Sequence, residues 1–282
     1  MPLLSVISGA YNLENCFSFE KSIESVLKQT FTDFEFIICD DGSTDKTYKM
    51  LESFAEKDPR IRILRNEKNL GHAAALNKCI EAATGEFIAR HDCDDYNDET
   101  RFEKQLDYLN KNPDVDILGT AAYLFDKNGV WDSVYFPERV TNESFLFTSP
   151  YQHGSVIFRR DALLKSGGYL VAKETRRNED YDLFMRMQVF AKGENLTERL
   201  YYFLEDEATL KRRKYRFRID EAKVRIRGFK NLGLMPKGFF YGIKPLIVGL
   251  MPSPILKKLR DKRRKSFAES MQNESSQKGE QA

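Results

Sequence analysis

Phe87-Ile-Ala-Arg-His-Asp-Cys-Asp-Asp95 passes from an apolar run to three carboxylates within nine residues. Apolar runs of this kind are typical of buried parallel strands, and ligands of open α/β sheets bind just beyond the carboxyl ends of such strands. Asp92 and Asp94 are therefore expected at a cleft. There a hard divalent cation, Mn²⁺ or Mg²⁺, would take carboxylate oxygens and keep positions open for phosphate. A solvated acidic loop is the alternative interpretation.

The segments around this stretch alternate between strand-like and helix-like patterns in units of about thirty residues. Such alternation is typical of right-handed βαβ crossovers and predicts an α/β fold, with a Rossmann-like, mostly parallel central sheet flanked by helices. We expect strands at residues 3–7, 34–39, 60–64, 87–91, 115–123 and 151–158, and a hairpin over residues 125–137. No Gly-x-Gly-x-x-Gly and no P-loop motif is present, which argues against a dinucleotide cofactor.

Acidic residues recur at two other predicted element ends. Asp40-Asp-Gly-Ser-Thr-Asp45 follows the second predicted strand. Since parallel strands end at the same edge of a sheet, this loop is expected near Asp92. Glu179 and Asp180 open a predicted helix, where they are either functional carboxylates or only partners of the helix dipole.

The composition indicates a cytoplasmic globular protein. The chain has 282 residues, of which 41% are hydrophobic and 12% aromatic, enough to bury one large core or two modest ones. Its four cysteines (Cys16, Cys39, Cys79 and Cys93) lack the paired spacing of a metal site, which suggests a reducing cytosol. The N-terminus enters a strand-like run without a signal-type segment, so export is not expected.

The C-terminal part of the chain is basic and partly apolar. Residues 211–265 contain nineteen Lys or Arg against three acids, whereas the whole chain has a formal net charge of +2. The apolar run Phe239–Met251 is interrupted by Lys244 and Pro245 and is shorter than the roughly twenty residues that span a bilayer. We expect peripheral binding to an anionic membrane surface, on the inner face of the cell membrane. The alternative is a helical appendage that packs on the catalytic domain or on another subunit. In the second case the protein would form a homo-oligomer. The aromatic residues are not interleaved with the charges, so nucleic acid is not an expected partner.

Several short motifs occur in a fixed order over roughly Leu3 to Tyr202. They are Ser5-Val-Ile-Ser-Gly-Ala-Tyr-Asn12, Ser25-Val-Leu-Lys-Gln-Thr30, Asp40-Asp-Gly-Ser-Thr-Asp45, Asn69-Leu-Gly71, Gly85-Glu-Phe-Ile-Ala-Arg90, Asp92-Cys-Asp-Asp95, Gly167-Gly-Tyr169 and Glu179-Asp-Tyr-Asp-Leu183. Together they resemble the motifs of family 2 glycosyltransferases. The resemblance implies the GT-A fold and an inverting transfer of a sugar from a nucleoside diphosphate donor, with a UDP-sugar favoured.

Carried over position by position, the resemblance implies a role for each candidate site residue. Asp94 would contact the metal ion, and Asp180 would be the catalytic base. Glu179 would support that base or contact the acceptor. His153 would line the acceptor side or make a structural hydrogen bond. The nucleotide-binding residues would be Ala10, Tyr11, Asn12, Asp40, Asp41 and Asp92.

Charged residues beside these motifs carry further expectations. Arg90 is expected to pair with Asp92 or Asp95, with a phosphate contact left open, and His72 and His91 are expected to be structural. The sequence departs from the family pattern after Tyr202, where relatives continue with an arginine and a histidine. This chain has Phe203-Leu-Glu-Asp-Glu207 instead. The positive charge would then come from Lys211, Arg212 and Arg213.

These observations predict a GT-A catalytic domain at residues 1–206, a basic helical extension at 207–265 and a disordered tail at 266–282. The expected activity is metal-dependent inverting sugar transfer to a hydroxyl of a glycan or lipid-linked glycan, in bacterial cell-surface polysaccharide synthesis. One alternative is a polyprenyl-phosphate sugar synthase, whose phosphate acceptor needs little help from a base. The other is a non-catalytic nucleotide-sugar-binding membrane scaffold.

Overall fold

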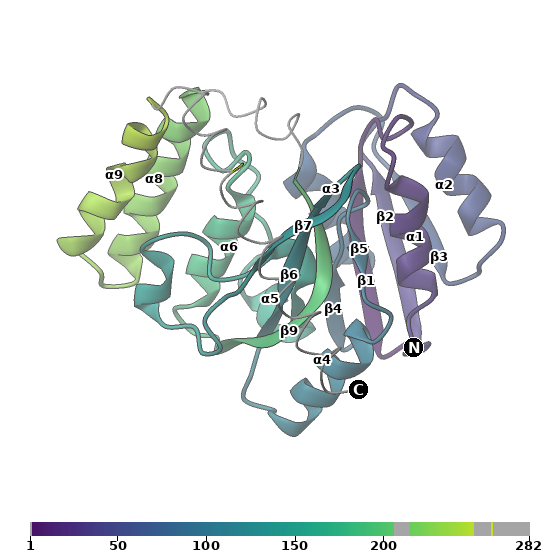
Figure 1. Cartoon of the computed structure of the whole chain (residues 1–282), viewed down its shortest axis with the longest axis horizontal. Helices are drawn as coiled ribbons and strands as arrows, with labels where there is room; N and C mark the ends of the chain where they lie inside the picture. The colour runs from purple at the N-terminus through teal and green to yellow at the C-terminus, as the bar shows by residue number, and fades with distance from the viewer. Residues whose placement is uncertain (1, 206–214, 251–260, 262–282) are drawn as a thin grey trace, which may run out of the picture.

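A computed structural model describes residues 2–205, 215–250 and 261 of the chain. Its centre is a nine-stranded sheet in the order β3-β2-β1-β4-β8-β6-β9-β5, with β7 paired to β6 (Figure 1). The strands are β1 Leu4–Ala10, β2 Phe34–Asp40, β3 Ile61–Arg65, β4 Phe87–Arg90, β5 Tyr96–Asn97, β6 Ile117–Asp126, β7 Gly129–Val134, β8 Ile157–Arg159 and β9 Gly193–Leu204.

The first four strands form the predicted parallel half of the sheet. β1 pairs in parallel with both β2 and β4, and β2 pairs in parallel with β3. Ala10 is in register with Asp40, and Ile7 with Arg90, so these strands deliver their carboxyl ends to one edge. The acidic loops that follow β2 and β4 therefore begin at the same edge, as the strand pattern predicted.

The second half of the sheet is mixed. β8 is antiparallel to β4 and β6, β7 forms a hairpin with β6, and β9 runs parallel to β6. The predicted hairpin at residues 125–137 is confirmed as the β6–β7 turn. The strand expected at 151–158 is shorter, because residues His153–Ser155 form a 3-10 turn (η2) before β8.

Helices cover both faces of the sheet, which confirms the α/β fold. Alternate strand residues point to opposite faces: Leu4 and Val6 of β1 belong to one buried cluster with Phe19 of α1, and Ile7 to the other cluster with Leu76 of α3. The helices are α1 Phe19–Leu27, α2 Thr47–Ala55, α3 His72–Ala82, α4 Arg101–Lys111, α5 Arg160–Lys165, α6 Glu179–Met187, α8 Tyr215–Asn231 and α9 Lys237–Val248.

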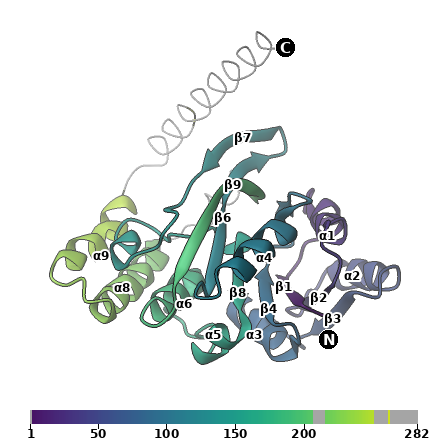
Figure 2. The ribbon, with the colours of Figure 1, turned by 90° about the horizontal axis from the view of Figure 1, so that it is seen from below.

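The C-terminal helices pack on the α/β core. Val224 and Phe229 of α8 are buried in the same cluster as Leu183 and Met187 of α6. Figures 1 and 2 show α8 and α9 side by side next to α6, at the opposite side of the molecule from β2 and β3. The helical character predicted for the extension is confirmed over these two helices. The expected disordered tail and the three basic residues at 211–213 lie outside the described residues.

α9 packs on α8 through small residues and turns its large apolar side chains outward. A Cβ at Gly238 would lie 2.9 Å from Phe229 Cβ, and one at Gly242 would lie 2.7 Å from Ile226 Cγ1. Phe240 and Ile247 of α9 are 70% and 65% exposed. Among the described residues, no helix combines the length and the apolar character needed to cross a bilayer.

Candidate active site

A cavity of about 1580 Å³ opens beside the carboxyl ends of β1, β2 and β4. Its walls come from the ends of these strands, from the η2 turn, from the start of α6 and from α8 and α9. Seven of the ten candidate site residues line it: Ala10, Tyr11, Asp41, Asp92, His153, Glu179 and Asp180. Asn12, Asp40 and Asp94 lie outside its lining. Residues separated by up to 170 positions in the sequence thus converge on one cavity.

Asp41 organises the end of the cavity formed by β1 and β2. Its carboxylate accepts hydrogen bonds from Asn66 Nδ2 at 2.8 Å, from the Leu70 backbone N–H at 2.9 Å and from the Gly71 backbone N–H at 2.8 Å. These bonds hold the loop before α3 against the loop after β2. Tyr11, 44% exposed at the same end, offers an open ring face on which a base can stack.

Asp40 and Asn12 tie these loops together rather than face the cavity. The Asp40 carboxylate is fully buried, accepts from the Ser43 backbone N–H at 3.3 Å and lies 3.2 Å from Arg65 Nε. Asn12 Oδ1 accepts from the Thr44 backbone N–H at 2.9 Å. Both side chains shape the loops at this end of the cavity, and a direct nucleotide contact for either remains a prediction.

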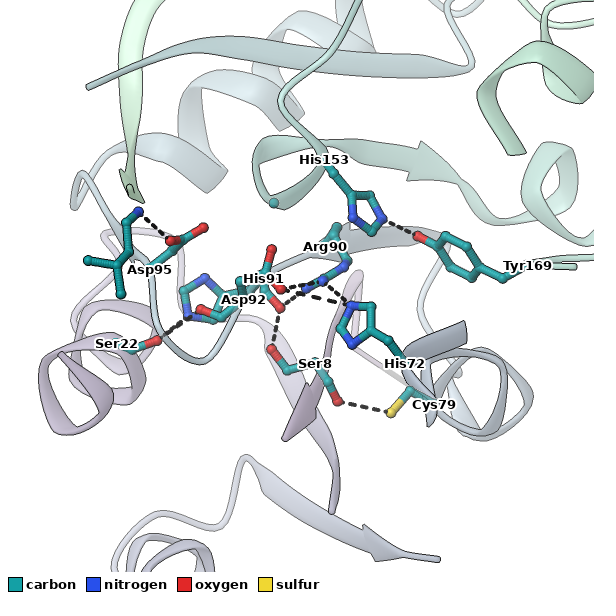
Figure 3. A network of polar contacts seen from close by, with 12 residues as sticks. Ser8, Ser22, His72, Cys79, Arg90, His91, Asp92, Asp95, His153 and Tyr169 are labelled. Atoms are coloured by element: carbon teal, nitrogen blue, oxygen red, sulfur yellow. Dashed lines mark hydrogen bonds and ion pairs between the residues drawn. The ribbon is translucent and has the colours of Figure 1, made fainter. Parts of the chain in front are cut away.

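The Asp92 carboxylate is held by a buried arginine. Arg90 Nη2 lies 2.5 Å from Asp92 Oδ1 and 2.6 Å from His72 Nε2, as Figure 3 shows. The Arg90 side chain is fully buried, whereas that of Asp92 is 25% exposed toward the cavity. Burial alone would raise the pKa of Asp92, but the Arg90 guanidinium and the nearby His72 hold that pKa well below its usual range. Asp92 is therefore an ionised carboxylate, and the predicted ion pair with Arg90 is confirmed.

His72 is a member of the site and not only a structural residue. Burial and the neighbouring Arg90 lower the pKa of His72 to about 4, so its ring is neutral. Because a guanidinium can only donate hydrogen bonds, His72 Nε2 must accept from Arg90, which places the ring proton on Nδ1. The other expectation is confirmed: buried His91 is held by Ser22 Oγ at 2.8 Å and Asn97 Nδ2 at 3.2 Å.

His153 faces the same part of the cavity from the η2 turn. Its Nε2 lies 2.7 Å from Tyr169 Oη, and its ring centroid lies 6.4 Å from that of His72. Burial holds the pKa of His153 well below its usual range, so this ring is neutral too. The structural hydrogen bond is thus present in a residue that also lines the cavity. Figure 3 shows this pair directly above the Arg90 network.

Glu179 and Asp180 enter the cavity from the first turn of α6. Burial raises the pKa of Asp180 to about 6, with a further contribution from the negative charge of Asp92. Burial and the adjacent Asp180 raise the pKa of Glu179 to about 7. A carboxylate whose pKa lies near neutrality can take a proton and release it again, which is the property required of a general base.

Asp94 lies in the turn after Asp92, where its backbone carbonyl accepts from Ser18 Oγ at 2.6 Å. Within the described parts of the chain, no three His, Cys, Asp or Glu side chains are grouped to hold a metal ion. Mg²⁺ and Mn²⁺ do not require such a cage, since they bind through one or two carboxylates plus the phosphates of a substrate. Asp92 lines the cavity and Asp94, two residues further along the chain, lies outside its lining; both are carboxylates of the kind that this donor set uses.

Two buried residues that sequence reasoning missed hold the site together. Arg101 of α4 is fully buried and donates to the Gly154 carbonyl and to the Arg90 carbonyl, both at 2.9 Å. Tyr201 Oη accepts from the Asp92 backbone N–H at 3.2 Å. The tyrosine also packs so closely that a Cβ at Gly154 would lie 2.1 Å from its hydroxyl. The sequence signal was weak, because an arginine in a first helical turn is ordinarily a surface residue and a tyrosine in a strand is as often partly exposed as buried.

Comparison with known proteins connects this geometry to a family. The model of the family described as Glycosyl transferase family 2 matches residues 5–167. EpsE of Bacillus subtilis (strain 168) is 36% identical over 264 residues, which cover 93% of this chain and 94% of EpsE. The Escherichia coli protein WfgD, named UDP-Glc:alpha-D-GlcNAc-diphosphoundecaprenol beta-1,3-glucosyltransferase, is 35% identical over 145 residues, covering 51% of this chain and 55% of WfgD.

Solved structures share the fold at low sequence identity. S. aureus TarS 1-349 in complex with UDP-GlcNAc superposes with a TM-score of 0.66 at 21% identity, covering 88% of this chain and 71% of that one. The mannosyltransferase PcManGT from Pyrobaculum calidifontis, in complex with GDP-Man and Mn²⁺, gives a TM-score of 0.59 at 19% identity, covering 92% and 78%. The fold is therefore that of nucleotide-sugar-binding GT-A proteins, and with the family match and the EpsE relationship, the chain belongs to glycosyl transferase family 2.

Proposed function

We propose that the protein is a metal-dependent inverting glycosyltransferase that uses a nucleoside diphosphate sugar, with a UDP-sugar favoured. The acceptor is a hydroxyl of a glycan, most simply a lipid-linked glycan, in cell-surface polysaccharide synthesis at the cytoplasmic face of the membrane. The observation that carries the proposal is the convergence of Asp41, Asp92 and Asp180 on one cavity from three separate elements. This substrate class is supported by the UDP-GlcNAc and GDP-Man bound to TarS and PcManGT, and by the donor and acceptor that the name of WfgD specifies.

Different residues bind the nucleoside, orient the donor and activate the acceptor. Asp41 and Tyr11 bind the nucleoside, and Asp92, kept ionised by Arg90, orients the ribose or the donor sugar. Asp180 removes the proton from the attacking acceptor hydroxyl. A bond forms between that oxygen and the anomeric carbon while the bond from that carbon to the diphosphate oxygen breaks. A single displacement with one base and no covalent intermediate inverts the anomeric centre.

The carboxylates of Asp92 and Asp94 have the chemistry that a divalent ion requires. When bound, Mn²⁺ or Mg²⁺ would be held by Asp94, with Asp92 beside it, and would stabilise the negative charge that develops on the departing diphosphate. The protein supplies the remaining positioning through the Arg90 ion pair and through Tyr201, which holds the Asp92 backbone.

Removal of divalent ions is expected to abolish sugar transfer, and Mn²⁺ or Mg²⁺ should restore it. A panel of nucleoside diphosphate sugars, scored by thermal stabilisation with and without Mn²⁺ and by Mn²⁺-dependent donor hydrolysis, tests donor and metal together. Asp94→Asn should raise the Mn²⁺ concentration needed for UDP-dependent stabilisation by about 10-fold or more. The matched control is Asp107→Asn, an exposed carboxylate on α4 that pairs with Lys111. Donor binding that is indifferent to Mn²⁺ in the wild type would contradict the metal assignment, and stabilisation by no donor in the panel would contradict the function.

Peripheral membrane binding is proposed for the outward face of α9. Phe240 and Ile247 of α9 are 70% and 65% exposed, Leu250 just after the helix is 73% exposed, and Lys237 and Lys244 lie on α9. Apolar side chains next to basic ones favour the surface of an anionic bilayer. The basic run at residues 257–265, which lies outside the described residues except for Asp261, would add to this attraction.

The double variant Phe240→Glu/Ile247→Glu should lower the affinity for vesicles rich in phosphatidylglycerol by about 10-fold or more, since each large side chain loses burial worth about 1.5–3 kcal/mol. Cosedimentation at two salt concentrations measures this. Val189→Glu, which changes a residue exposed to 61% outside α9, is the matched control. Equal binding of all three proteins would rule out α9 as the membrane contact.

A further inference from the structure

The cavity extends beyond the carboxylates between the loop at residues 171–177 and helices α8 and α9. Six cations from these segments line it, against a single acid, Glu221. We call these six residues the basic arm: Lys173, Arg176, Arg177, Arg218, Arg225 and Lys244. An arm of this composition attracts an anion, and the nucleoside-side residues of the cavity do not account for it.

Within the described residues, ion pairs neutralise the positive charge of the basic arm only in part. Glu221 bonds Arg218 Nη1 at 2.9 Å and Arg225 Nη2 at 3.0 Å, so one acid serves two guanidinium groups. Arg225 also donates to the Leu146 carbonyl at 3.3 Å, which makes it part of the scaffold. Among the described residues, Lys173 and Arg176 take part in no ion pair, and both are exposed at the cavity.

The wall around these cations is apolar. Phe217 of α8 lines the cavity and carries the Arg177 guanidinium at 5.0 Å from its ring centroid. Pro245 and Val248 of α9 continue the wall, and Val171 faces the cavity from the loop. Arg177 adopts φ +71°, a conformation that a non-glycine residue takes only when its surroundings hold it there. Cations set in an apolar wall suit an anion that is attached to an apolar chain.

The basic arm adjoins the proposed base and lies away from the nucleoside. Arg176 and Arg177 are separated from Glu179 and Asp180 only by Asn178, which precedes α6. Figures 1 and 2 place α6, α8 and α9 on one side of the molecule and β2, whose end carries Asp41, on the other. An anion on this arm would therefore be on the acceptor side of Asp180.

We propose that the basic arm binds the phosphate or diphosphate group of the acceptor, in a molecule where that group joins the acceptor sugar to an apolar chain. This assignment rests on the proposed function and specifies its acceptor. The cations hold the anion through charge-assisted hydrogen bonds, and the Phe217, Pro245 and Val248 wall receives the start of the chain. The attacking hydroxyl, on the sugar next to the anion, is thereby presented to Asp180.

Calorimetric titration of the full-length protein with farnesyl diphosphate, below its micelle concentration and with UDP and Mn²⁺ saturating, tests the proposal. UDP occupies the nucleotide site, so the titration measures binding to the rest of the cavity. Farnesyl diphosphate should bind about 10-fold or more tightly than either farnesol or inorganic diphosphate, because each lacks one half of the recognised group. Equal affinity for inorganic diphosphate would overturn the proposal, and so would binding that UDP displaces completely.

The variant Lys173→Gln/Arg176→Gln should weaken farnesyl diphosphate binding about 10-fold or more and leave UDP affinity unchanged. Lys230→Gln, an exposed lysine of α8 outside the cavity, should alter neither affinity. If the double variant weakens UDP binding instead, the cations serve the donor and the proposal is wrong. If the wild type binds no nucleotide, the proposed function fails separately, while titration without UDP still reports on the basic arm.

Discussion

Asp180→Asn is expected to lower kcat for sugar transfer by about 10²–10⁴-fold, the range typical for removal of a general base. The amide has nearly the same shape as the carboxylate, so the cavity and the start of α6 should be retained. Donor affinity should not change, because the nucleoside binds at Asp41 and Tyr11. The measurement is kcat at saturating donor, together with the UDP affinity of the variant.

The same residue predicts the pH profile. The raised pKa of Asp180, about 6, means that the carboxyl group holds its proton below that pH and is an active base above it. The kcat of the wild type should therefore rise with pH through about 6 and then level off, and the Asp180→Asn variant should lose this limb. Glu179→Gln is the comparison variant. Because the pKa of Glu179 is about 7, a rise of the wild-type kcat centred near pH 7 would assign the base to Glu179 instead.

Substantial residual activity in Asp180→Asn would favour a different acceptor. A phosphate oxygen is already ionised and needs little help from a base, so the variant of a polyprenyl-phosphate sugar synthase should keep most of its activity. If the wild type binds donor but transfers sugar to no acceptor, the non-catalytic scaffold would be the remaining interpretation. The one substitution thus separates the proposed function from both alternatives.

Arg90→Met is expected to lower the free energy of unfolding by about 3–5 kcal/mol, because it leaves the Asp92 carboxylate largely buried without its counter-charge. The fully buried guanidinium also contacts His72 and the His91 carbonyl, whose partners would be lost. Urea unfolding measures the change. The exposed pair Lys28–Glu24 has a similar distance of 2.7 Å, yet Lys28→Met should lower the free energy of unfolding far less, since solvent screens that pair.

A double-mutant cycle isolates the ion pair from the loss of packing. Asp92→Asn removes the charge that Arg90 neutralises, so Arg90→Met should cost less in the Asp92→Asn background than in the wild type. Strictly additive effects would mean that the pair does not stabilise the fold, and that Arg90 is retained for its hydrogen bonds to the backbone and His72.

The parallel half of the sheet was predictable because its signals are local. Short apolar runs ending in polar turns mark β1, β2 and β4, and parallel pairing then brings their carboxyl ends to one edge whatever the details of packing. The meeting of Asp41 and Asp92 in one cavity followed from that rule alone. The position of Asp180 depends on contacts of α6 that no local pattern reports, and it came from the family resemblance.

Other parts of the site depended on tertiary contacts that a sequence does not express. The segment before β8 was expected to be a strand, but it forms a 3-10 turn in which Gly154 leaves room for the Tyr201 ring. The charges of α8 resemble a solvated face, yet Arg225 is buried, with its guanidinium bonded to Glu221 and to backbone carbonyls near Phe147. Long-range partners of this kind determined which charges became internal.

Because Val224 and Phe229 are buried against α6, helix α8 has two roles. α8 covers the hydrophobic interior with one face and lines the proposed acceptor side of the cavity with another, through Phe217 and Arg218. Recognition and folding are therefore coupled in this segment. A homologue that acquires a new acceptor by exchanging its C-terminal helices must also rebuild the surface of α6 beneath them, which limits how freely such segments can be recombined during evolution.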